Sequence, residues 1–499
     1  MQAAENISQQ LSGVLQSLPY VSPEVWLTVL LILVIVTDLL FGKTSAWICR
    51  TLAAVGMAFV LFNCLQQLHL VTHEGKFLFG GMLLLHKTAV VFKSFIDVFA
   101  IVLILYVKQD KKFNSHKKGL SDLYTIVIAS VLGLHLMVMA VNLLTVYTAI
   151  EMVSLASYLL VAYHTESGLG SGAGLKYVLF GAASSAVMLY GISLIYALTG
   201  SLNYFGSNLL TGLAANPTVA VVAIVLMLVG IGFKLSFIPM HFWVPDVYQG
   251  APTPVTAYLS TLPKIAGFAM LINFLTPFVF SAGWHAFDFR LTLSVIGIIT
   301  MIAGNFAAVW QTNIKRLLAY SSIGHTGFAL MALVTFTNQG ISALVFYLVA
   351  YAIANIAALM LVSWFGNVAG TEDIDGYKGL GLRHPAAGVC FIIILISLTG
   401  IPVSAGFNAK LLVFSSVYAV YEETKSLPLL LLLITGAVTT VISLFYYIKV
   451  PLNLFLRKGN GEKAFHDTRS STGLLSIILF LTALTLALGL FPNLLAGLL

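Results

Sequence analysis

The chain has 499 residues, of which 59% are hydrophobic and only 9% are charged, and its formal net charge is +7. Because soluble domains are about a quarter charged, this composition excludes an ordinary soluble globular protein, and a mean hydropathy of +0.98 predicts many membrane crossings. The positive charge is no evidence for nucleic-acid binding, since in a membrane protein the placement of basic residues matters more than their sum.

Apolar runs of about 20 residues follow one another along the chain, separated by short polar gaps. Each can cross about 30 Å of hydrocarbon as a helix, whereas barrel strands need only about ten residues of alternating polarity. We therefore predict an all-α polytopic membrane protein with about fourteen transmembrane helices. The expected spans are residues 25–42, 48–67, 83–107, 121–140, 142–163, 175–199, 217–240, 254–276, 290–311, 316–336, 340–365, 388–420, 428–450 and 472–497.

The predicted helices fall into four consecutive segments. Residues 1–120 form an N-terminal three-helix segment, 121–276 a first group of five helices, 290–450 a second group of five, and 472–499 a C-terminal helix. Because each group has an odd number of crossings, a second copy of the same unit must be inverted in the membrane. We therefore expect two inverted five-helix repeats.

The fourth helix of each five-helix group contains both a lysine and a proline. The first is "GFKLSFIPMHFW", with Lys234 and Pro239, and the second is "SLTGIPVSAGFNAKLLVF", with Pro402 and Lys410. Proline removes a backbone hydrogen bond and clashes with the preceding turn, so both helices are predicted to be discontinuous. The alternative is a chance coincidence, because prolines are common in transmembrane helices.

Basic residues gather on one side of the membrane when fourteen helices are counted. By the positive-inside rule that side is cytoplasmic, so both termini are expected on the periplasmic side. The first ten residues have no basic segment ahead of a short apolar core, and no cleaved signal peptide is expected. The basic residues on the predicted cytoplasmic side are Lys43, Arg50, Lys108, Lys111, Lys112, Lys117, Lys118, Lys315, Arg316, Lys378, Arg383, Lys449, Arg457, Lys458, Lys463 and Arg469, against Lys76, Arg290 and Lys425 opposite.

The three cysteines are too far apart in the sequence to suggest a metal or cluster site. Cys49, Cys64 and Cys390 have no paired spacing, and no Gly-rich nucleotide-binding loop follows a predicted strand. No cofactor or metal is therefore expected in this chain.

Several ionisable residues lie deep inside the predicted helices. An unpaired charge at a helix centre costs about 2.5–3.5 kcal/mol on insertion scales. Lys234 is 17 residues after Pro217 and 12 before Asp246, about 18 Å or more from either marker and beyond the reach of a side chain that snorkels to the surface. Lys264 and Lys410 are similarly deep.

Glu151 is the natural partner for a lysine of the first five-helix group. At about 4 Å and an effective dielectric constant of 20, such a pair interacts by about 4 kcal/mol. Making or breaking it could switch a buried lysine between its charged and neutral forms. The alternative is a static ion pair, but Lys176, Lys234 and Lys264 would then share one carboxylate.

Three histidines and one pair of opposite charges also lie inside the predicted helices. His241 and His325 could relay protons because the usual pKa of histidine is about 6.5, whereas His135 stands alone and is interpreted as hydrogen-bonded structure. Lys93 and Asp97 are four residues apart and are expected to neutralise each other on one helix.

Three stretches resemble the antiporter-like membrane subunits of respiratory complex I, and the resemblance extends over essentially the whole chain. They are "GFKLSFIPMHFWVPDVYQGAPTPVTAYLSTLPK", "NFAAVWQTNIKRLLAYSSIGHTGF" and "SLTGIPVSAGFNAKLLVF". Within the family, "PDVYQGAPTPV" is similar to the form found in the branch called chain N or subunit 2, whereas the sister branches M and L usually differ after "PD".

The resemblance implies a proton-translocating subunit of a bacterial inner-membrane NADH:quinone oxidoreductase. NADH, FMN, iron-sulfur clusters and quinone would belong to partner subunits, and the partners here would be sister antiporter-like subunits and small membrane subunits. The family's proton path runs along the membrane plane, and it implies proton transfer by Glu151, Lys176, Lys234, His241, Lys264, His325 and Lys410.

Two other functions remain open. A subunit of a sodium/proton antiporter or of a membrane-bound hydrogenase of the same superfamily would share these motifs, although "YQGAPTP" argues against it. A membrane scaffold without transport activity is the third hypothesis, and it predicts that lysine-to-alanine changes alter only assembly.

Overall fold

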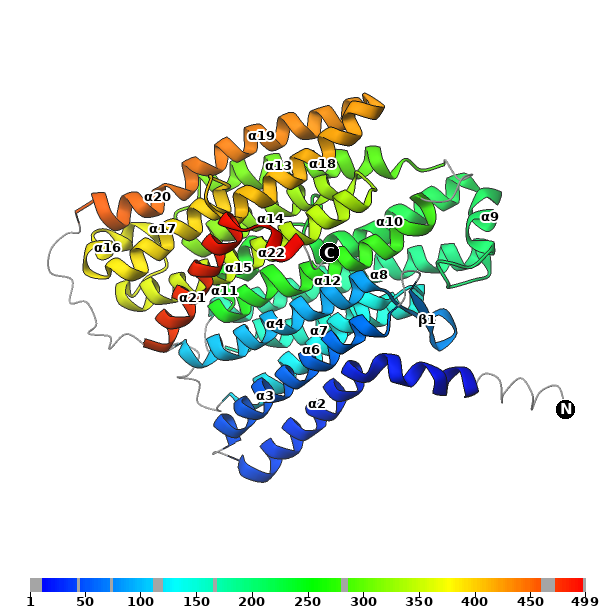
Figure 1. The fold of residues 1–499 in the computed structure, drawn as a ribbon, viewed down its shortest axis with the longest axis horizontal. Coiled ribbons are helices and arrows are strands. Elements are labelled where there is room, and N and C mark those ends of the chain that lie inside the picture. The colour runs from blue at the N-terminus through cyan, green and yellow to red at the C-terminus, as the bar shows by residue number, and fades with distance from the viewer. Residues whose placement is uncertain are drawn as a thin grey trace.

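Long apolar helices make up most of the computed structural model of the protein, and they lie side by side in one elongated bundle (Figure 1). α2 and α3 lie at one edge of this bundle and α19 at the opposite edge. The structure describes residues 11–42, 45–71, 75–110, 120–164, 168–279, 286–458 and 472–496.

The N-terminal segment has three long helices and a small hairpin. Antiparallel strands β1 and β2 pair Phe77 with Leu84. The elements are η1 (Leu18–Val21), α2 (Ser22–Phe41), α3 (Ser45–Gln66), η3 (Gln67–His69), β1 (Lys76–Leu78), η4 (Phe79–Gly81), β2 (Leu83–Leu85) and α4 (Lys87–Gln109).

Residues 121–279 and 289–456 each form a set of helices. The first group contains α6 (Ser121–Met139), α7 (Leu143–Val161), α8 (Gly168–Thr199), α9 (Asn208–Ala215), α10 (Pro217–Leu235), α11 (Val244–Gly250) and α12 (Thr253–Val279). The second contains α13 (Phe289–Val309), α14 (Ile314–Leu333), α15 (Asn338–Ala369), η5 (Ile374–Tyr377), α16 (Leu380–Arg383), α17 (Pro385–Thr399), α18 (Ala405–Thr424), α19 (Leu427–Tyr447), α20 (Lys449–Pro451) and η6 (Leu452–Leu456). α21 (Thr472–Leu490) and α22 (Asn493–Ala496) follow.

Both predicted helix interruptions are confirmed. α10 ends at Leu235, where Ser236 adopts the left-handed conformation with φ 58°, and α11 starts only at Val244. The expected span 388–420 is in fact two helices: α17 ends at Thr399, Gly400 has φ 88°, and α18 starts at Ala405. Lys234 therefore lies just before the first interruption, and Lys410 lies one turn into the helix after the second.

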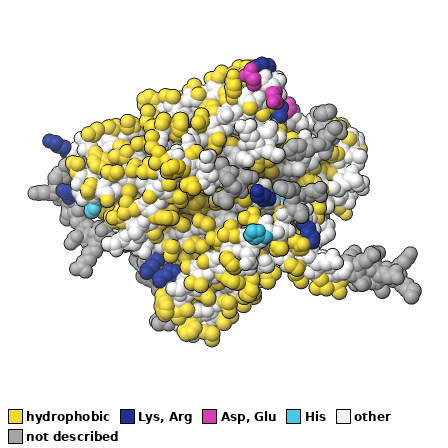
Figure 2. Space-filling model, viewed as in Figure 1, with side chains coloured by type: hydrophobic (Ala, Val, Ile, Leu, Met, Phe, Trp, Pro, Cys, Tyr) yellow, Lys and Arg dark blue, Asp and Glu magenta, His cyan; other side chains and the backbone are white. Residues whose placement is uncertain are grey.

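The outer helices present apolar side chains and the central ones are enclosed. Hydrophobic side chains cover most of the face in Figure 2, and many large ones on α2, α3 and α19 are exposed. In contrast, the most apolar part of α15 is completely buried. Of the described helices, twelve are long and apolar enough to cross a membrane, so the chain is a multi-pass membrane protein.

α13 and α14 approach each other closely because glycines face each other across their contact. A Cβ atom on Gly304 would lie 2.5 Å from the backbone nitrogen of Gly324. Small residues at such contacts allow backbones to pack closely inside a membrane. This packing holds α14, which carries most of the polar groups described below, in the middle of the bundle.

Part of the predicted charge asymmetry lies outside the described residues. The first ten residues also lie outside them, as do the basic residues Lys43, Lys111, Lys112, Lys117, Lys118, Lys463 and Arg469.

Candidate functional site

Lys234 is buried beside the interruption after α10. Its residue is 3% exposed, and its Nζ has no hydrogen-bond partner among the described residues. The interruption itself is stabilised by Trp243, whose Nε1 donates to the carbonyl oxygen of Phe233 at 3.2 Å, a group that also accepts a hydrogen bond from the backbone N–H of Ser236 at 3.3 Å. An ammonium group without a partner in this environment would be costly, so its deep placement requires a functional explanation.

Glu151 on α7 makes no hydrogen bond with any lysine that the structure describes. Its Oε1 accepts a hydrogen bond from Ser185 on α8. Glu151 is nevertheless close enough to interact electrostatically with Lys234. Which lysine Glu151 pairs with was left open by the sequence, and the carboxylate here bonds a hydroxyl group on the neighbouring helix.

Lys176 lies on the surface of the chain, with 54% of its side chain exposed, and pairs with Asp246. Its Nζ is 2.5 Å from Asp246 Oδ2, and Arg316 Nη1 is 2.6 Å from Asp246 Oδ1. In this structure the carboxylate that binds Lys176 is therefore Asp246, near the start of α11, and not Glu151. Sequence reasoning missed Asp246 as a partner, although it stands in the quoted "PD" motif.

Asp246 is held in its ionised form by these two cations. The hydrogen bond from Lys176 lowers the pKa of Asp246 most, partial burial raises it, and Arg316 lowers it further. Because the pKa of Asp246 is lower in the folded protein, its contribution to stability is complete when the pH is above the usual aspartate pKa of about 3.9. That contribution is lost as the pH falls through the lower pKa of the folded state.

Replacing Asp246 with Asn is expected to lower the thermal stability of the purified protein at neutral pH by a modest amount. Each of these partly exposed ion pairs contributes up to about 1 kcal/mol, and the two join α8, α11 and α14. Differential scanning measurements at neutral and acidic pH test this, with Glu422→Gln, which removes an exposed pair on α18, as the control. A difference from wild type that persists well below the folded pKa would contradict it.

Lys264 on α12 binds α14 through three hydrogen bonds. Its Nζ lies 2.8 Å from Ser322 O, 2.7 Å from Ser322 Oγ and 2.9 Å from Thr326 Oγ1. Thr326 Oγ1 in turn donates to the carbonyl oxygen of Leu235 at 3.0 Å, the last residue of α10. The buried lysine of one helix group is therefore linked to the interruption beside Lys234 through a helix of the other group.

The polar chain continues from Ser322 toward the second interruption. Tyr351 on α15 donates to Ser322 Oγ at 2.8 Å, and its ring lies 4.7 Å from the ring of His325. His325 Nδ1 is 2.6 Å from Tyr347 Oη, and its Nε2 is 3.3 Å from Tyr447 Oη. The imidazole therefore has hydroxyl groups at both nitrogens, which suits either protonation state.

Lys410 forms the far end of this chain. Its Nζ lies 2.7 Å from Thr399 O, a carbonyl freed by the second interruption, and 3.3 Å from Thr440 Oγ1. A cavity of about 10 Å³ separates Lys410 from His325 and its tyrosines, which is room for about one water molecule. One water molecule there would connect the histidine with the lysine.

The seven predicted residues are thus only partly brought together. Lys264, His325 and Lys410 share the polar chain, and Lys234 lies where the chain begins. His241 lies between α10 and α11, half-buried, and its Nδ1 has no hydrogen-bond partner among the described residues. Sequence reasoning missed the hydroxyl groups that connect the lysines, although serines and threonines at helical spacing in "SSIGHTGF" carry that signal.

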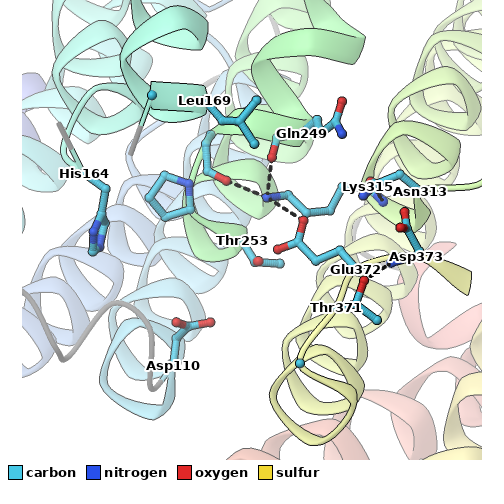
Figure 3. A pocket seen from close by; sticks show the side chains of 15 residues that line it. Asp110, His164, Leu169, Gln249, Thr253, Asn313, Lys315, Thr371, Glu372 and Asp373 are labelled. Atoms are coloured by element: carbon cyan, nitrogen blue, oxygen red, sulfur yellow. Dashed lines mark hydrogen bonds and ion pairs between the residues drawn. The ribbon is translucent and has the colours of Figure 1, made fainter. Parts of the chain in front are cut away.

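A polar cavity of about 620 Å³ lies elsewhere, at the ends of α11 and α15 (Figure 3). Lys315 is buried at its wall and donates to Gln249 O at 2.9 Å and Ala251 O at 2.6 Å, with Glu372 Oε2 at 3.5 Å. Lys315 therefore stabilises the backbone between α11 and α12. The cavity shares no lining residue with the lysine chain.

No group of three or more His, Cys, Asp or Glu side chains is arranged to hold a metal ion in the part of the chain that the structure describes. The three cysteines are free and buried.

Buried lysines and a histidine beside two interrupted helices are typical of ion-translocating membrane proteins. The chain belongs to the NADH:quinone oxidoreductase/Mrp antiporter transmembrane family, whose model matches residues 140–443.

Relatives of known name cover most of the chain. It is 38% identical to NADH-quinone oxidoreductase subunit N 2 of Chloroherpeton thalassium, over 94% of this chain and 91% of the relative. It is 36% identical to NAD(P)H-quinone oxidoreductase subunit 2 of a Synechococcus strain, over 87% of this chain and 80% of the relative.

Solved structures share the fold. A chain of respiratory complex I from Thermus thermophilus superposes with a TM-score of 0.78 at 28% identity, covering 95% of this chain and 98% of that one. A chain of an archaeal membrane-bound sulfane sulfur reductase has a TM-score of 0.82 at 23% identity, with 96% of each chain covered, and shows the fold alone.

Proposed function

We propose that this chain is the N-type membrane subunit, also called subunit 2, of a bacterial NADH-quinone oxidoreductase, and that it moves protons across the membrane. NADH oxidation and quinone reduction take place in partner subunits, which carry the NADH, FMN, iron-sulfur and quinone sites. Its neighbours are sister antiporter-like subunits and small membrane subunits. The relatives' names and their coverage support this assignment.

The proposal includes a topology of fourteen crossings. The fourteen crossings are the twelve candidate spans together with α14 and the α17–α18 pair. Polar residues in α14 and the interruption between α17 and α18 make these two crossings less continuously apolar than the other twelve. The segments are then 1–120, the inverted repeats 121–276 and 290–450, and 472–499, with both termini on the periplasmic side of the inner membrane.

The proposed path follows the buried polar chain through the middle of the bundle. Glu151 controls the charge state of Lys234 electrostatically, without a hydrogen bond to it. His241 and Lys176 transfer protons near the first interruption. Lys264 then passes protons by way of Ser322, Tyr351 and His325 toward Lys410. The observation that carries this proposal is the run of hydrogen bonds from Leu235 O through Thr326, Lys264 and Ser322 to Tyr351. The ring of Tyr351 contacts that of His325, and a cavity with room for about one water molecule lies between His325 and Lys410.

Replacing Lys410 with Ala is expected to reduce NADH-driven proton uptake while the complex remains assembled. Loss of a positioned proton-transfer group slows its step by about 10²-fold or more, so the number of protons moved per NADH falls. Proton uptake by proteoliposomes containing the purified complex is the measurement. The control is Lys425→Ala at the end of the same helix, where the lysine is exposed and paired with Glu422.

The same experiment separates the alternatives. Wild-type proton uptake by an assembled Lys410→Ala complex would contradict the proposed path. Purification with sodium-dependent antiport and without NADH oxidation would instead identify an antiporter subunit. Loss of assembly alone in the lysine variants would favour a scaffold.

A further inference from the structure

A second group of buried ionisable side chains lies in the N-terminal part of the bundle, apart from the lysine chain. It consists of Glu24 on α2, Lys93 and Asp97 on α4, and His135 on α6. Lys93, Asp97 and His135 are completely buried and Glu24 is 5% exposed. The expectation that Lys93 and Asp97 neutralise each other is wrong, because Lys93 Nζ instead lies 2.9 Å from Glu24 Oε1 and 2.7 Å from Gln67 Oε1.

His135 bridges the two carboxyl groups. Its Nδ1 is 2.9 Å from Glu24 Oε1, and its Nε2 is 3.0 Å from Asp97 Oδ1. The earlier interpretation of His135 as hydrogen-bonded is thus confirmed, but it does not stand alone. This arrangement places a carboxyl oxygen at each ring nitrogen.

Two hydrogen bonds of this kind need two protons. A neutral imidazole donates from one nitrogen and accepts at the other, whereas an ionised carboxylate only accepts. The site is therefore satisfied in three ways: imidazolium between two carboxylates, or neutral imidazole with either Glu24 or Asp97 protonated. These states differ only in the position of protons along hydrogen bonds of about 3 Å, and no heavy atom has to change partner.

Charged neighbours compensate for the movement of the proton. Lys93 places its positive charge beside Glu24 and offsets the negative charge that remains when a proton leaves this carboxyl group. Cys64 on α3 is the neighbouring titratable group, close enough to interact electrostatically with Lys93 and Asp97, and His86 at the start of α4 interacts with Lys93.

The cluster joins α2, α4 and α6 through side chains that are all buried. Glu24 is the third residue of α2, whereas Asp97 is ten residues after Lys87, the first residue of α4. Because Glu24 Oε1 and Asp97 Oδ1 contact opposite nitrogens of one imidazole ring, the cluster can carry a proton from α2 to α4 across the width of that ring. Glu24 Oε2 and Asp97 Oδ2 have no hydrogen-bond partner among the described residues, so both ends can receive a further donor.

We propose that Glu24, His135 and Asp97 form a proton relay that connects α2 with α4 through His135 of α6, inside the N-terminal part of the bundle. Protonated Glu24 gives its proton to Nδ1 while Nε2 gives its proton to the Asp97 carboxylate. Glu24 is then ionised, Asp97 is protonated, and the imidazole is neutral again with its proton on Nδ1. The relay rests on the proposed function in that protons are the ions this chain moves.

The test uses the purified complex with Asp97→Asn, an isosteric change that still accepts a hydrogen bond from Nε2 but cannot take up a proton. The matched control is Ser94→Ala on the same helix, which bonds Cys64 and a backbone carbonyl outside the relay. Infrared difference spectra between about pH 6 and pH 9, around the usual imidazole pKa of about 6.5, report protonated carboxyl groups without any redox activity. Proton uptake per NADH is measured in parallel.

We expect Asp97→Asn to remove a deuterium-sensitive carboxyl band and to slow proton transfer at this step by about 10²-fold or more, with wild-type levels of assembled complex. A wild-type infrared spectrum in the variant would overturn the relay, as would loss of assembly with no spectral change. If proton uptake is unchanged in both Asp97→Asn and Lys234→Met, the relay and the proposed function both fail. If it is unchanged in Asp97→Asn but reduced in Lys234→Met, only the relay fails.

Discussion

Replacing Lys234 with Met is expected to suppress proton translocation while leaving the complex assembled. The Nζ atom of Lys234 makes no hydrogen bond to the described residues, so its removal breaks no hydrogen bond among them. An apolar side chain of similar length also removes the cost of burying an ammonium group that has no hydrogen-bond partner. The proton-transfer step should nevertheless slow by about 10²- to 10⁴-fold.

Proton uptake and thermal denaturation of the same preparation separate these two effects. Lys87→Met is the matched control, because this lysine is exposed at the start of α4. A complex with Lys234→Met that pumps at the wild-type rate would remove Lys234 from the proposed path. A complex that fails to assemble would show that the lysine stabilises the interruption of α10, contrary to the geometry.

The second large effect is expected at Lys264, and two substitutions distinguish its roles. Lys264→Met removes the donor to Ser322 and Thr326, and unsatisfied buried acceptors cost about 1–3 kcal/mol. Lys264→Arg keeps a donor and a positive charge, but a guanidinium group does not lose its proton in proteins. Both variants should lose proton transfer, whereas only Lys264→Met should also unfold at a lower temperature.

Proton uptake and thermal unfolding of the two variants are compared with wild type in one series. Normal pumping by Lys264→Arg would show that Lys264 acts only as a fixed charge. Equal stability of the two variants would show that the bonds between α12 and α14 contribute little to holding the two helix groups together.

Sequence periodicity was sufficient for the class of fold and for the two interrupted helices. Long apolar runs admit little else in a membrane, and proline with a left-handed glycine or serine ends a helix wherever it lies, as Ser236 and Gly400 do. The burial of Lys234, Lys264 and Lys410 is likewise confirmed, because the distance of a residue from the ends of its helix follows directly from its place in the sequence.

Partners across helices were predicted less well. Lys93 and Asp97 have the right spacing to pair on one helix, yet each binds a residue of another helix. Glu151 bonds to Ser185, and Lys176 bonds to Asp246. Helical spacing limits which residues share a face, but it does not state which face of a neighbouring helix lies opposite.

The sequence by itself determined that this is a many-helix membrane protein with lysines buried beside two interrupted helices, because hydrophobic length and proline act locally. Only the tertiary structure decided that α14 and α15 supply the hydroxyl groups between Lys264 and Lys410, and that His135 joins Glu24 to Asp97. These contacts are between residues far apart in the chain, and they depend on helix packing that close approaches such as Gly304 against Gly324 make possible.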